Sequence, residues 1–345
     1  MKILVSALEI SSNVHLKALM EKLDSTFEFI GIYDKSLGKP NYDVSQMAVM
    51  GFVDALKKLP FFLNLKKEMV ELAKEADKVL LMDGSGFNLP LAKAIKKAYP
   101  DKEVIYYILP QAWAWKKKRI AVLEQTCDKL LSILPFEKNH YSKSAPIEFV
   151  GHPLLDEIKV FKEELTKSGK IVFMPGSRKG EITKLMPIYS EIAKKIDKQA
   201  ILVIPKHFSK LFIDSTYGDT SHFVISRNTY EALEEAEFAF ICSGTATLEA
   251  ALMGTPFVLS YIANPVDYFI AKRLVKLKYI GLANIFFEQM GKPIMHQEFI
   301  QENVNEFNLL KAYNSIDKDK FLRNSFYLRD YLHNGSSQKV ADFLV

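Results

Sequence analysis

The sequence contains few of the residues that stabilise small cross-linked or metal-dependent domains. Only two cysteines occur among 345 residues, Cys127 and Cys242, and neither belongs to a C-x-x-C pair or to a Cys/His cluster. Their separation argues against a disulfide framework and against a structural zinc site. Both thiols are therefore predicted to be buried small apolar groups.

Long uncharged segments are lacking too. The N-terminal apolar run ends at Glu9, which is too early for a secretory signal and favours a first strand. The longest uncharged stretch, residues 250–266, is interrupted by Gly254, Pro256 and Pro265, so it does not favour a continuous spanning helix. We expect no transmembrane segment and a cytoplasmic protein.

The composition is otherwise that of an ordinary globular chain. With 48% hydrophobic residues among 345, the chain is long enough to bury two cores. Its net charge of +5 suits acidic partners, which include phosphorylated metabolites, anionic lipid and nucleic acid. Charge alone does not choose among these partners.

Short apolar runs alternate with longer segments of helical spacing along the whole chain. This alternation predicts an α/β fold with parallel sheets covered on both faces. Twelve such runs are too many for one typical open sheet, so we expect two doubly wound, Rossmann-like domains. The runs occupy residues 2–8, 27–33, 78–84, 103–110, 129–135, 147–151, 170–176, 200–205, 222–226, 238–244, 256–262 and 279–285.

The polar stretch 156–170 is the predicted connection between the domains. We place the first domain at residues 1–160 and the second at 170–320. Residues 321–345 return to helical spacing and are expected to form a tail that can pack back on the N-terminal domain.

The end of the run 170–176 carries a candidate anion site, because ligands of open parallel sheets bind at the carboxyl ends of strands. Gly176, Ser177 and Arg178 follow the run, and Glu181 starts the next helix. Backbone N–H groups at a helix start, together with a guanidinium, suit a phosphate or diphosphate. A serine-capped helix with a solvated Arg-Lys pair is the alternative.

The end of the run 238–244 is similar. Ser243, Gly244 and Thr245 open a helix, and their small size lets a ligand approach the backbone. Glu249 lies one turn into that helix, where it could accept hydrogen bonds from ribose hydroxyls, or simply favour the N-terminal half of the helix electrostatically. The spacing matches neither G-x-G-x-x-G nor a Walker loop.

Asp83 is the candidate carboxylate of the first domain. It ends an apolar run and is followed by Gly84-Ser85-Gly86, which we interpret as flexible turn residues. An aspartate at a strand end is positioned for general-base work on a hydroxyl. A turn-capping aspartate is the alternative.

Two segments combine aromatic with basic residues. Residues 110–119 place Trp113 and Trp115 before four consecutive cations, and residues 47–67 contain Phe61 and Phe62 among lysines. Such mixtures suit an anionic lipid surface or single-stranded nucleic acid. Solvated or sheet-packed amphipathic helices are the alternatives.

Taken together, these stretches resemble the lipid A disaccharide synthase family over nearly the whole chain. The resemblance implies an inverting glycosyltransferase of GT-B architecture, with two Rossmann-like domains facing each other across a cleft. The segments with Trp-Ala-Trp, LPFEK and GHP are not general features of that fold, which makes the resemblance specific. It is carried, in order, by VMGFVDAL, DGSGFN, LPQAWAWKKKRI, ILPFEKNHY, FVGHPLLDE, MPGSRKGEI, SGTATLEAALMGTP, AKRLVK and YIGLANI.

The family's reaction moves 2,3-diacylglucosamine from its UDP derivative to the 6-hydroxyl of 2,3-diacylglucosamine 1-phosphate. The products are the β-1,6-linked lipid A disaccharide 1-phosphate and UDP, in the lipopolysaccharide biosynthesis of Gram-negative bacteria. The resemblance implies Asp83 as general base, Arg178 at the diphosphate, and Asn284 as a further catalytic residue after the last strand. It implies no metal and no cofactor. The implied UDP site consists of Gly176, Ser177, Arg178, Ser243, Gly244, Thr245 and Glu249.

Two motifs depart from the family pattern. Where the family has G-E-x-S-G-D, residues 8–13 of this sequence read L-E-I-S-S-N. Glu9 is kept, but the glycine and the final acidic residue, replaced by Asn13, are lost. Where the family has D-x-P-x-F-N, Asp83, Phe87 and Asn88 remain and the proline is absent. The carboxylate that the chemistry needs is therefore retained.

Because the implied substrates are acylated, we expect the aromatic and basic segments to contact a membrane surface together. We expect a peripheral enzyme on the cytoplasmic face of the inner membrane, with no nucleic-acid partner, and a homodimer stays open. The predicted acceptor and membrane residues are Glu9, Asn88, Phe61, Phe62, Trp113, Trp115, Lys116, Arg119, Lys272 and Arg273.

Three other interpretations stay open from the sequence. A different GT-B enzyme that uses a UDP-sugar, such as an epimerase or a muramyl-lipid glycosyltransferase, would share the fold but not the Trp-Ala-Trp and LPFEK segments. A lipid-binding relative without activity would show no turnover. A nucleic-acid binder would prefer oligonucleotides to anionic vesicles, but the chain has no RRM, KH or helix-turn-helix signature.

Overall fold

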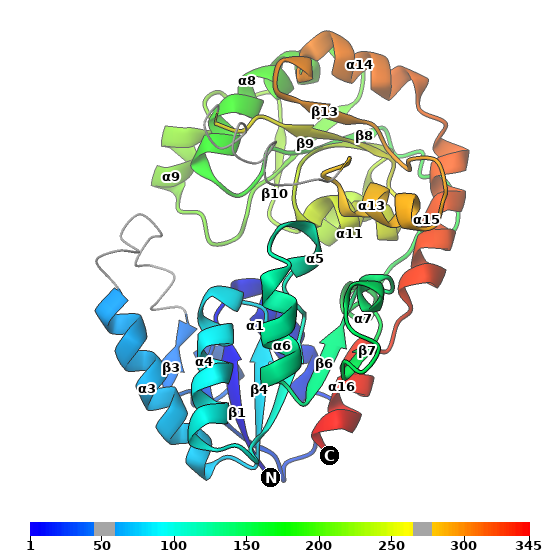
Figure 1. Ribbon diagram of the computed structural model, residues 1–345. Coiled ribbons are helices and arrows are strands. Elements are labelled where there is room, and N and C mark those ends of the chain that lie inside the picture. The colour runs from blue at the N-terminus through cyan, green and yellow to red at the C-terminus, as the bar shows by residue number, and fades with distance from the viewer. Residues whose placement is uncertain (45–58, 265–277) are drawn as a thin grey trace. The chain divides into compact units, whose positions relative to one another are not determined.

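The computed structural model describes residues 1–44, 59–264 and 278–345 and divides into two compact units (Figure 1). The first unit contains Met1–Glu157 and Leu332–Val345, and the second contains Ile158–Tyr331. The chain therefore leaves the first unit once and returns to it with its last helix. Residues 321–345 are shared between the two units.

The first domain is built on a seven-stranded sheet of order β3-β2-β1-β4-β5-β6-β7, in which every pair is parallel. All six apolar runs predicted in this half form strands, and their side chains are mostly buried. The strands are β1 (Lys2–Ala7), β2 (Glu28–Tyr33), β3 (Tyr42–Asp43), β4 (Lys78–Met82), β5 (Glu103–Tyr107), β6 (Lys129–Ser132) and β7 (Ile147–Phe149).

Helices cover both faces of this sheet (Figure 1). One face packs against α3 (Leu59–Glu75), α4 (Ser85–Ala98) and α6 (Lys118–Thr126). The other packs against α1 (Ile10–Met20) and the C-terminal α16 (Ser336–Leu344). Because strand side chains alternate, Tyr106 joins the first core and Tyr107 the second. The shorter helices are α5 (Ala112–Trp115), α7 (Leu154–Glu157) and the 3-10 turns Lys35–Leu37 and Glu137–His140.

The second domain repeats the design with a six-stranded parallel sheet of order β10-β9-β8-β11-β12-β13. Five of the six runs predicted in this half form its strands. The strands are β8 (Lys170–Met174), β9 (Gln199–Val203), β10 (Val224–Ser226), β11 (Phe238–Cys242), β12 (Phe257–Tyr261) and β13 (Glu298–Ile300).

The helices of the second domain also lie on both faces of its sheet. The helices α8 (Lys179–Lys195), α9 (Lys210–Thr216) and α14 (Glu306–Ser315) share one core that is rich in aromatic rings, most of them packed edge-on or tilted. On the other face, α11 (Thr245–Met253) packs between α10 (Thr229–Glu235) and α13 (Leu282–Gln289). The helix that ends this domain, α15 (Lys318–Leu332), contacts the end of α11. Arg329 Nε donates a hydrogen bond to the Leu252 carbonyl at 2.6 Å.

Two local predictions were wrong. The run 279–285 is not a strand, because α13 begins at Leu282 and the last strand is the short β13 instead. The carboxylate of Glu298 accepts hydrogen bonds from the N–H groups of Ile280 and Gly281, at 2.9 and 3.0 Å, which holds this segment at a helix start. The residues after Asp83 are not a flexible turn either, since α4 starts at Ser85.

Glycine at position 31 is required by the pairing of β1 with β2. Gly31 has a φ of 109°, and a Cβ there would overlap the carbonyl oxygen of Val5 on the neighbouring strand. We expect Gly31→Ala to destabilise the first domain by roughly 2–4 kcal/mol, through backbone strain and overpacking.

Gly86→Ala is the matched control, because Gly86 lies in α4 and a Cβ there meets no atom within 4 Å. This substitution should be neutral or stabilise by up to about 1 kcal/mol through helix propensity. Urea unfolding followed by circular dichroism measures both, and equal midpoints for the two variants would contradict the steric argument.

Candidate functional site

In the first domain, the candidate carboxylates meet where the strand order reverses. The register pairs Ala7 of β1 with Met82 of β4, and Glu9 and Asp83 follow directly after these two strand ends. Helices leave the two strands toward opposite faces of the sheet, which is the arrangement that opens a ligand crevice in doubly wound folds. We call this place the first switch point.

Both carboxylates are partly removed from water. Burial raises the pKa of Glu9, and the negative charge of Asp83 raises it further. Burial also raises the pKa of Asp83, while the backbone N–H of Gly84 and the nearby imidazole of His15 oppose that rise. A carboxyl with a raised pKa binds a proton more strongly than an ordinary aspartate or glutamate.

His15 was not a predicted site residue. Its Nδ1 forms a short contact with Glu157 Oε1, and both side chains are largely buried. The pair joins α1 to α7, which are 142 positions apart in sequence. No local pattern could have found it, because a single histidine in a helix has no distinguishing spacing.

Asn88 lies beside this site but does not face it. The side chain is buried; its Oδ1 accepts a hydrogen bond from Ser6 Oγ at 2.6 Å, and its Nδ2 donates to the carbonyls of Met82 and Asp83 at 3.1 and 2.9 Å. The contact of Asn88 with the acceptor stays a prediction, because the structure shows its amide bonded within the protein. Its amide holds the turn between β4 and α4.

The side chains of the basic Trp segment, residues 110–119, differ in how far they are buried. Trp113 is only 7% exposed and packs edge-on against Phe136, with ring centroids 4.9 Å apart, and in parallel with His140. Trp113 is thus a core residue in the structure, and its contact with acceptor or membrane stays a prediction. Lys116 is exposed, and Arg119 Nη1 donates to Ser85 Oγ at the first turn of α4, at 2.7 Å.

Part of the predicted membrane surface can be located on α3. Phe61 and Leu63 are 39% and 45% exposed, whereas Phe62 packs against Phe87 with ring centroids 6.1 Å apart. Lys272, Arg273, residues 47–58 and the side chain of Trp115 lie outside what the structure describes. Within the described ranges, no helix has the length and hydropathy needed to cross a membrane.

The second domain has an equivalent switch point between β8 and β11. The two strands are hydrogen-bonded neighbours, with Met174 opposite Ile241. The turn Gly176-Ser177-Arg178 follows β8, and Ser243-Gly244-Thr245 follows β11. The structure therefore brings together the two segments that the sequence analysis had linked to a nucleotide.

The turn after β8 binds an anionic group, and in the structure that group is the carboxylate of Glu181. Glu181 Oε2 accepts hydrogen bonds from the N–H groups of Ser177 and Arg178, at 3.3 and 3.2 Å, and its Oε1 accepts from Arg178 Nη1 at 2.8 Å. A Cβ at Gly176 would lie 2.5 Å from Glu181 Oε2. The glycine is thus needed for the carboxylate to reach the turn.

Arg178 nevertheless stays available to a ligand. Its side chain is 80% exposed, and only one of its five guanidinium N–H groups is needed for the Glu181 contact. The hydrogen bond with Glu181 and then its charge raise the pKa of Arg178, so the guanidinium is cationic. The turn is consequently both a capped helix start and a cation at the sheet edge.

The segment after β11 offers backbone atoms at an open surface. Gly244 and Thr245 are exposed, and a Cβ at Gly244 would meet no atom within 4 Å. The helix α11 starts here without a side-chain cap, and Glu249 is half-buried one turn further on. The N–H groups at this helix start suit a negatively charged group.

Asn284 is buried in α13 and lies before the last strand of the sheet. Its Nδ2 donates to the His296 carbonyl and to Glu298 Oε1, at 2.9 and 2.8 Å, and its Oδ1 accepts from the Met295 N–H at 2.8 Å. The predicted placement after the last strand is wrong, whereas the catalytic role of Asn284 stays a prediction. Asn284 joins α13 to the segment before β13.

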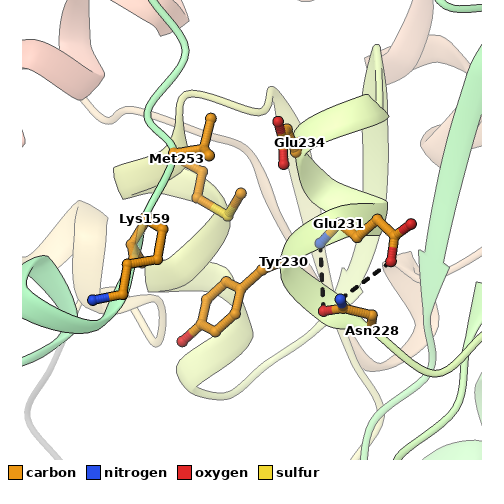
Figure 2. A pocket seen from close by; sticks show the side chains of 8 residues that line it. Lys159, Asn228, Tyr230, Glu231, Glu234 and Met253 are labelled. Atoms are coloured by element: carbon orange, nitrogen blue, oxygen red, sulfur yellow. Dashed lines mark hydrogen bonds between the residues drawn. The ribbon is translucent and has the colours of Figure 1, made fainter. Parts of the chain in front are cut away.

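A pocket of about 250 Å³ also lies in the second domain (Figure 2). It is bordered by the chain entering the domain, by α10 and by the end of α11. Asn228 and Glu231 bond to each other in its wall, with Asn228 Nδ2 3.1 Å from Glu231 Oε2. None of the predicted site residues lines it. The lining residues are Ile158, Lys159, Val160, Asn228, Tyr230, Glu231, Glu234 and Met253.

Comparison with solved structures identifies the fold class as that of two-domain GT-B glycosyltransferases. The rhamnosyltransferase SpnG matches with a TM-score of 0.60 and 13% identity, covering 100% of both chains. The UDP-GlcNAc 2-epimerase from Neisseria meningitidis matches with a TM-score of 0.60 and 12% identity, covering 100% of this chain and 99% of that one. At these identities the likeness concerns the fold alone.

The sequence comparisons identify the family within that class. The lipid-A-disaccharide synthetase family matches residues 3–340. A lipid-A-disaccharide synthase of Helicobacter pylori (strain Shi470) is 50% identical over 99% of this chain and 97% of its own length. One from Campylobacter jejuni (strain RM1221) is 47% identical over 99% and 98%. The chain belongs to the lipid-A-disaccharide synthase family, as the sequence resemblance had indicated.

Glu137, in the LPFEK motif, generates a prediction about stability. It is fully buried and accepts a hydrogen bond from Ser132 Oγ at 2.5 Å, and burial raises its pKa from 4.5 to about 8. Between these values the folded protein keeps a proton that the unfolded chain has lost. Stability should therefore fall as the pH rises from about 4.5 to 8.

Glu137→Gln should reduce this loss, because the amide cannot ionise. The measurement is the melting temperature from pH 5 to pH 9 for both proteins. The variant should lose less stability than the wild type over this range. Parallel curves would show that Glu137 does not carry the dependence.

Proposed function

We propose that the protein transfers 2,3-diacylglucosamine from UDP-2,3-diacylglucosamine to 2,3-diacylglucosamine 1-phosphate. The observation that carries the proposal is that one switch point holds carboxylates and the other holds a cation. The first places the carboxylates Glu9 and Asp83 at one sheet edge, and the second places Arg178 beside an open helix start. Family membership supports the choice of substrates.

In the proposed reaction, the 6-hydroxyl oxygen of the acceptor attacks the anomeric carbon of the donor. The new glycosidic bond forms with inversion as the bond between that carbon and the diphosphate oxygen breaks. Asp83 accepts the hydroxyl proton, and UDP leaves with the electron pair. The raised pKa of Asp83 suits this step, because it makes the carboxylate a better proton acceptor than an ordinary aspartate.

The second domain is proposed to bind UDP. Charge develops on the diphosphate as the bond breaks, and the Arg178 guanidinium with the N–H groups of Gly244 and Thr245 can stabilise it. Glu249 is proposed to accept hydrogen bonds from the ribose. The reaction is proposed to need no metal ion, since these groups supply the positive potential.

The first domain is proposed to bind the acceptor and the membrane surface. Arg119 of α6 donates a hydrogen bond to Ser85 in the first turn of α4, two residues after Asp83, and a cation there suits the acceptor phosphate. Phe61 and Leu63 expose apolar surface on α3, which can enter the lipid boundary. We place the enzyme on the cytoplasmic face of the inner membrane. A homodimer stays a prediction, which light scattering tests.

Disaccharide formation from the two substrates in detergent tests the reaction. Asp83→Asn keeps the shape of the side chain but removes the base, and kcat should fall by about 10²–10⁴-fold. Arg178→Ala should lower kcat by about 10²–10³-fold and weaken UDP binding. No disaccharide from folded wild-type protein that binds UDP would refute the substrates while leaving the nucleotide site in place.

Flotation with vesicles that contain anionic lipid tests the membrane contact. Phe61→Ser combined with Leu63→Ser should reduce the bound fraction several-fold, because both side chains are exposed. Phe62 is left unchanged because it packs on the core. Leu211→Ser on α9, where Leu211 is 81% exposed, is the control. Equal flotation of all variants would exclude this part of α3 as the contact.

A further inference from the structure

The backbone at Asp83 has a conformation that aspartate seldom adopts. Its φ is 47°, in the left-handed region, which is uncommon for L-residues other than glycine although aspartate is among those that enter it, and which costs free energy that the surroundings must offset. The conformation sets the direction of the Asp83 side chain at the end of β4. Whatever enforces it therefore aims the candidate base.

Two buried side chains bind the carbonyl of this residue. Tyr106 Oη donates a hydrogen bond to the Asp83 carbonyl oxygen at 2.5 Å, and Asn88 Nδ2 donates to the same oxygen at 2.9 Å. Neither Tyr106 nor Asn88 reaches solvent. The Asp83 N–H is held as well, by the Tyr107 carbonyl at 3.2 Å. The peptide group after Asp83 is thus fixed from the neighbouring strand β5 and from α4.

We propose that Tyr106 is a positioning residue for the candidate base, acting through the Asp83 carbonyl. Its hydroxyl holds Asp83 in the left-handed conformation and so keeps the carboxylate at the first switch point, beside Glu9. Asn88 shares this task from the other side. The inference rests on the proposed function, because it takes Asp83 to be the base.

Tyr107 provides a matched control. It follows Tyr106 in β5, is equally buried, and points to the opposite core, where its hydroxyl bonds to Ser336 Oγ at 2.9 Å. Removing either hydroxyl costs one buried hydrogen bond. Only the removal at Tyr106 frees the Asp83 peptide. Tyr106→Phe and Tyr107→Phe therefore separate positioning from general stability.

Tyr106→Phe should also change the pKa of Asp83. The groups that face Asp83 are Glu9, His15, the Gly84 N–H and Tyr106, and Arg119 acts on Tyr106 in turn. Burial is the main cause of the raised Asp83 pKa. A freed peptide lets the carboxylate turn toward water, so its pKa in Tyr106→Phe should fall toward the ordinary aspartate value.

The kinetic experiment compares wild type with the two tyrosine variants. Tyr106→Phe should lower kcat by about 10- to 100-fold, since misplacement of a reacting group by about 1 Å has effects of this size. Its UDP affinity should stay within about twofold, because UDP is proposed to bind in the second domain. Tyr107→Phe should keep kcat near wild type even where it lowers the melting temperature.

Two further measurements separate this inference from the proposed function. In an Asp83→Asn background, Tyr106→Phe should cause no further loss of kcat, since the base is already absent. Carboxyl NMR of protein labelled at aspartate, with the Asp83 signal assigned from Asp83→Asn, should show the lowered pKa in Tyr106→Phe alone.

The outcomes are distinct. Absence of disaccharide from the wild type refutes the proposed function, whereas the NMR titration still decides whether Tyr106 controls Asp83. Disaccharide formation with equal kcat and equal Asp83 titration in wild type and Tyr106→Phe overturns the role of Tyr106. Equal losses in both tyrosine variants also overturn it, since they would indicate a general effect on the sheet.

Discussion

The parallel pairing of β1 with β4, and of β8 with β11, is the constraint on which both candidate sites depend. In each domain these neighbours are the strands at which the order of the sheet reverses. After these two strands the chain continues toward opposite faces of the sheet. No loop therefore crosses over the two strand ends, and the backbone there is left accessible. Every residue proposed to react or to bind the diphosphate follows one of these four strands.

The two switch points use electrostatics in opposite ways. At the first, burial raises the pKa of Asp83 and of Glu9, which makes the carboxylates better proton acceptors. At the second, Glu181 takes the N–H groups of the turn and leaves the Arg178 guanidinium largely exposed. A basic carboxylate suits the removal of a proton, and an exposed cation suits a leaving diphosphate.

Several motif residues act by holding the structure. Asn88 and Asn284 are polar residues in motifs shared with the family, yet both amides are buried and bonded to backbone atoms. Glu137 is likewise a buried carboxyl that is bonded to Ser132. A buried polar group costs free energy unless its partners are in place, so such residues fix the loops at the sheet edge. Their presence in a motif therefore does not identify a substrate contact.

The sequence by itself determined the α/β class, eleven of the thirteen strands found in the described residues and the segments that surround the two switch points. These follow from local information, because apolar runs and helical spacing are readable within short windows. Only β3 and β13 escaped, because β3 has two residues and β13 has only two apolar residues, Phe299 and Ile300, between polar ones.

The tertiary structure alone decided which polar side chains are exposed and which are buried. Asn88 bonds to Ser6 across 82 positions, and His15 meets Glu157 across 142. Trp113 is likewise buried against Phe136, although four cations follow at positions 116–119. Burial depends on partners that are distant in sequence and meet only when the sheet forms, so no local pattern specifies it.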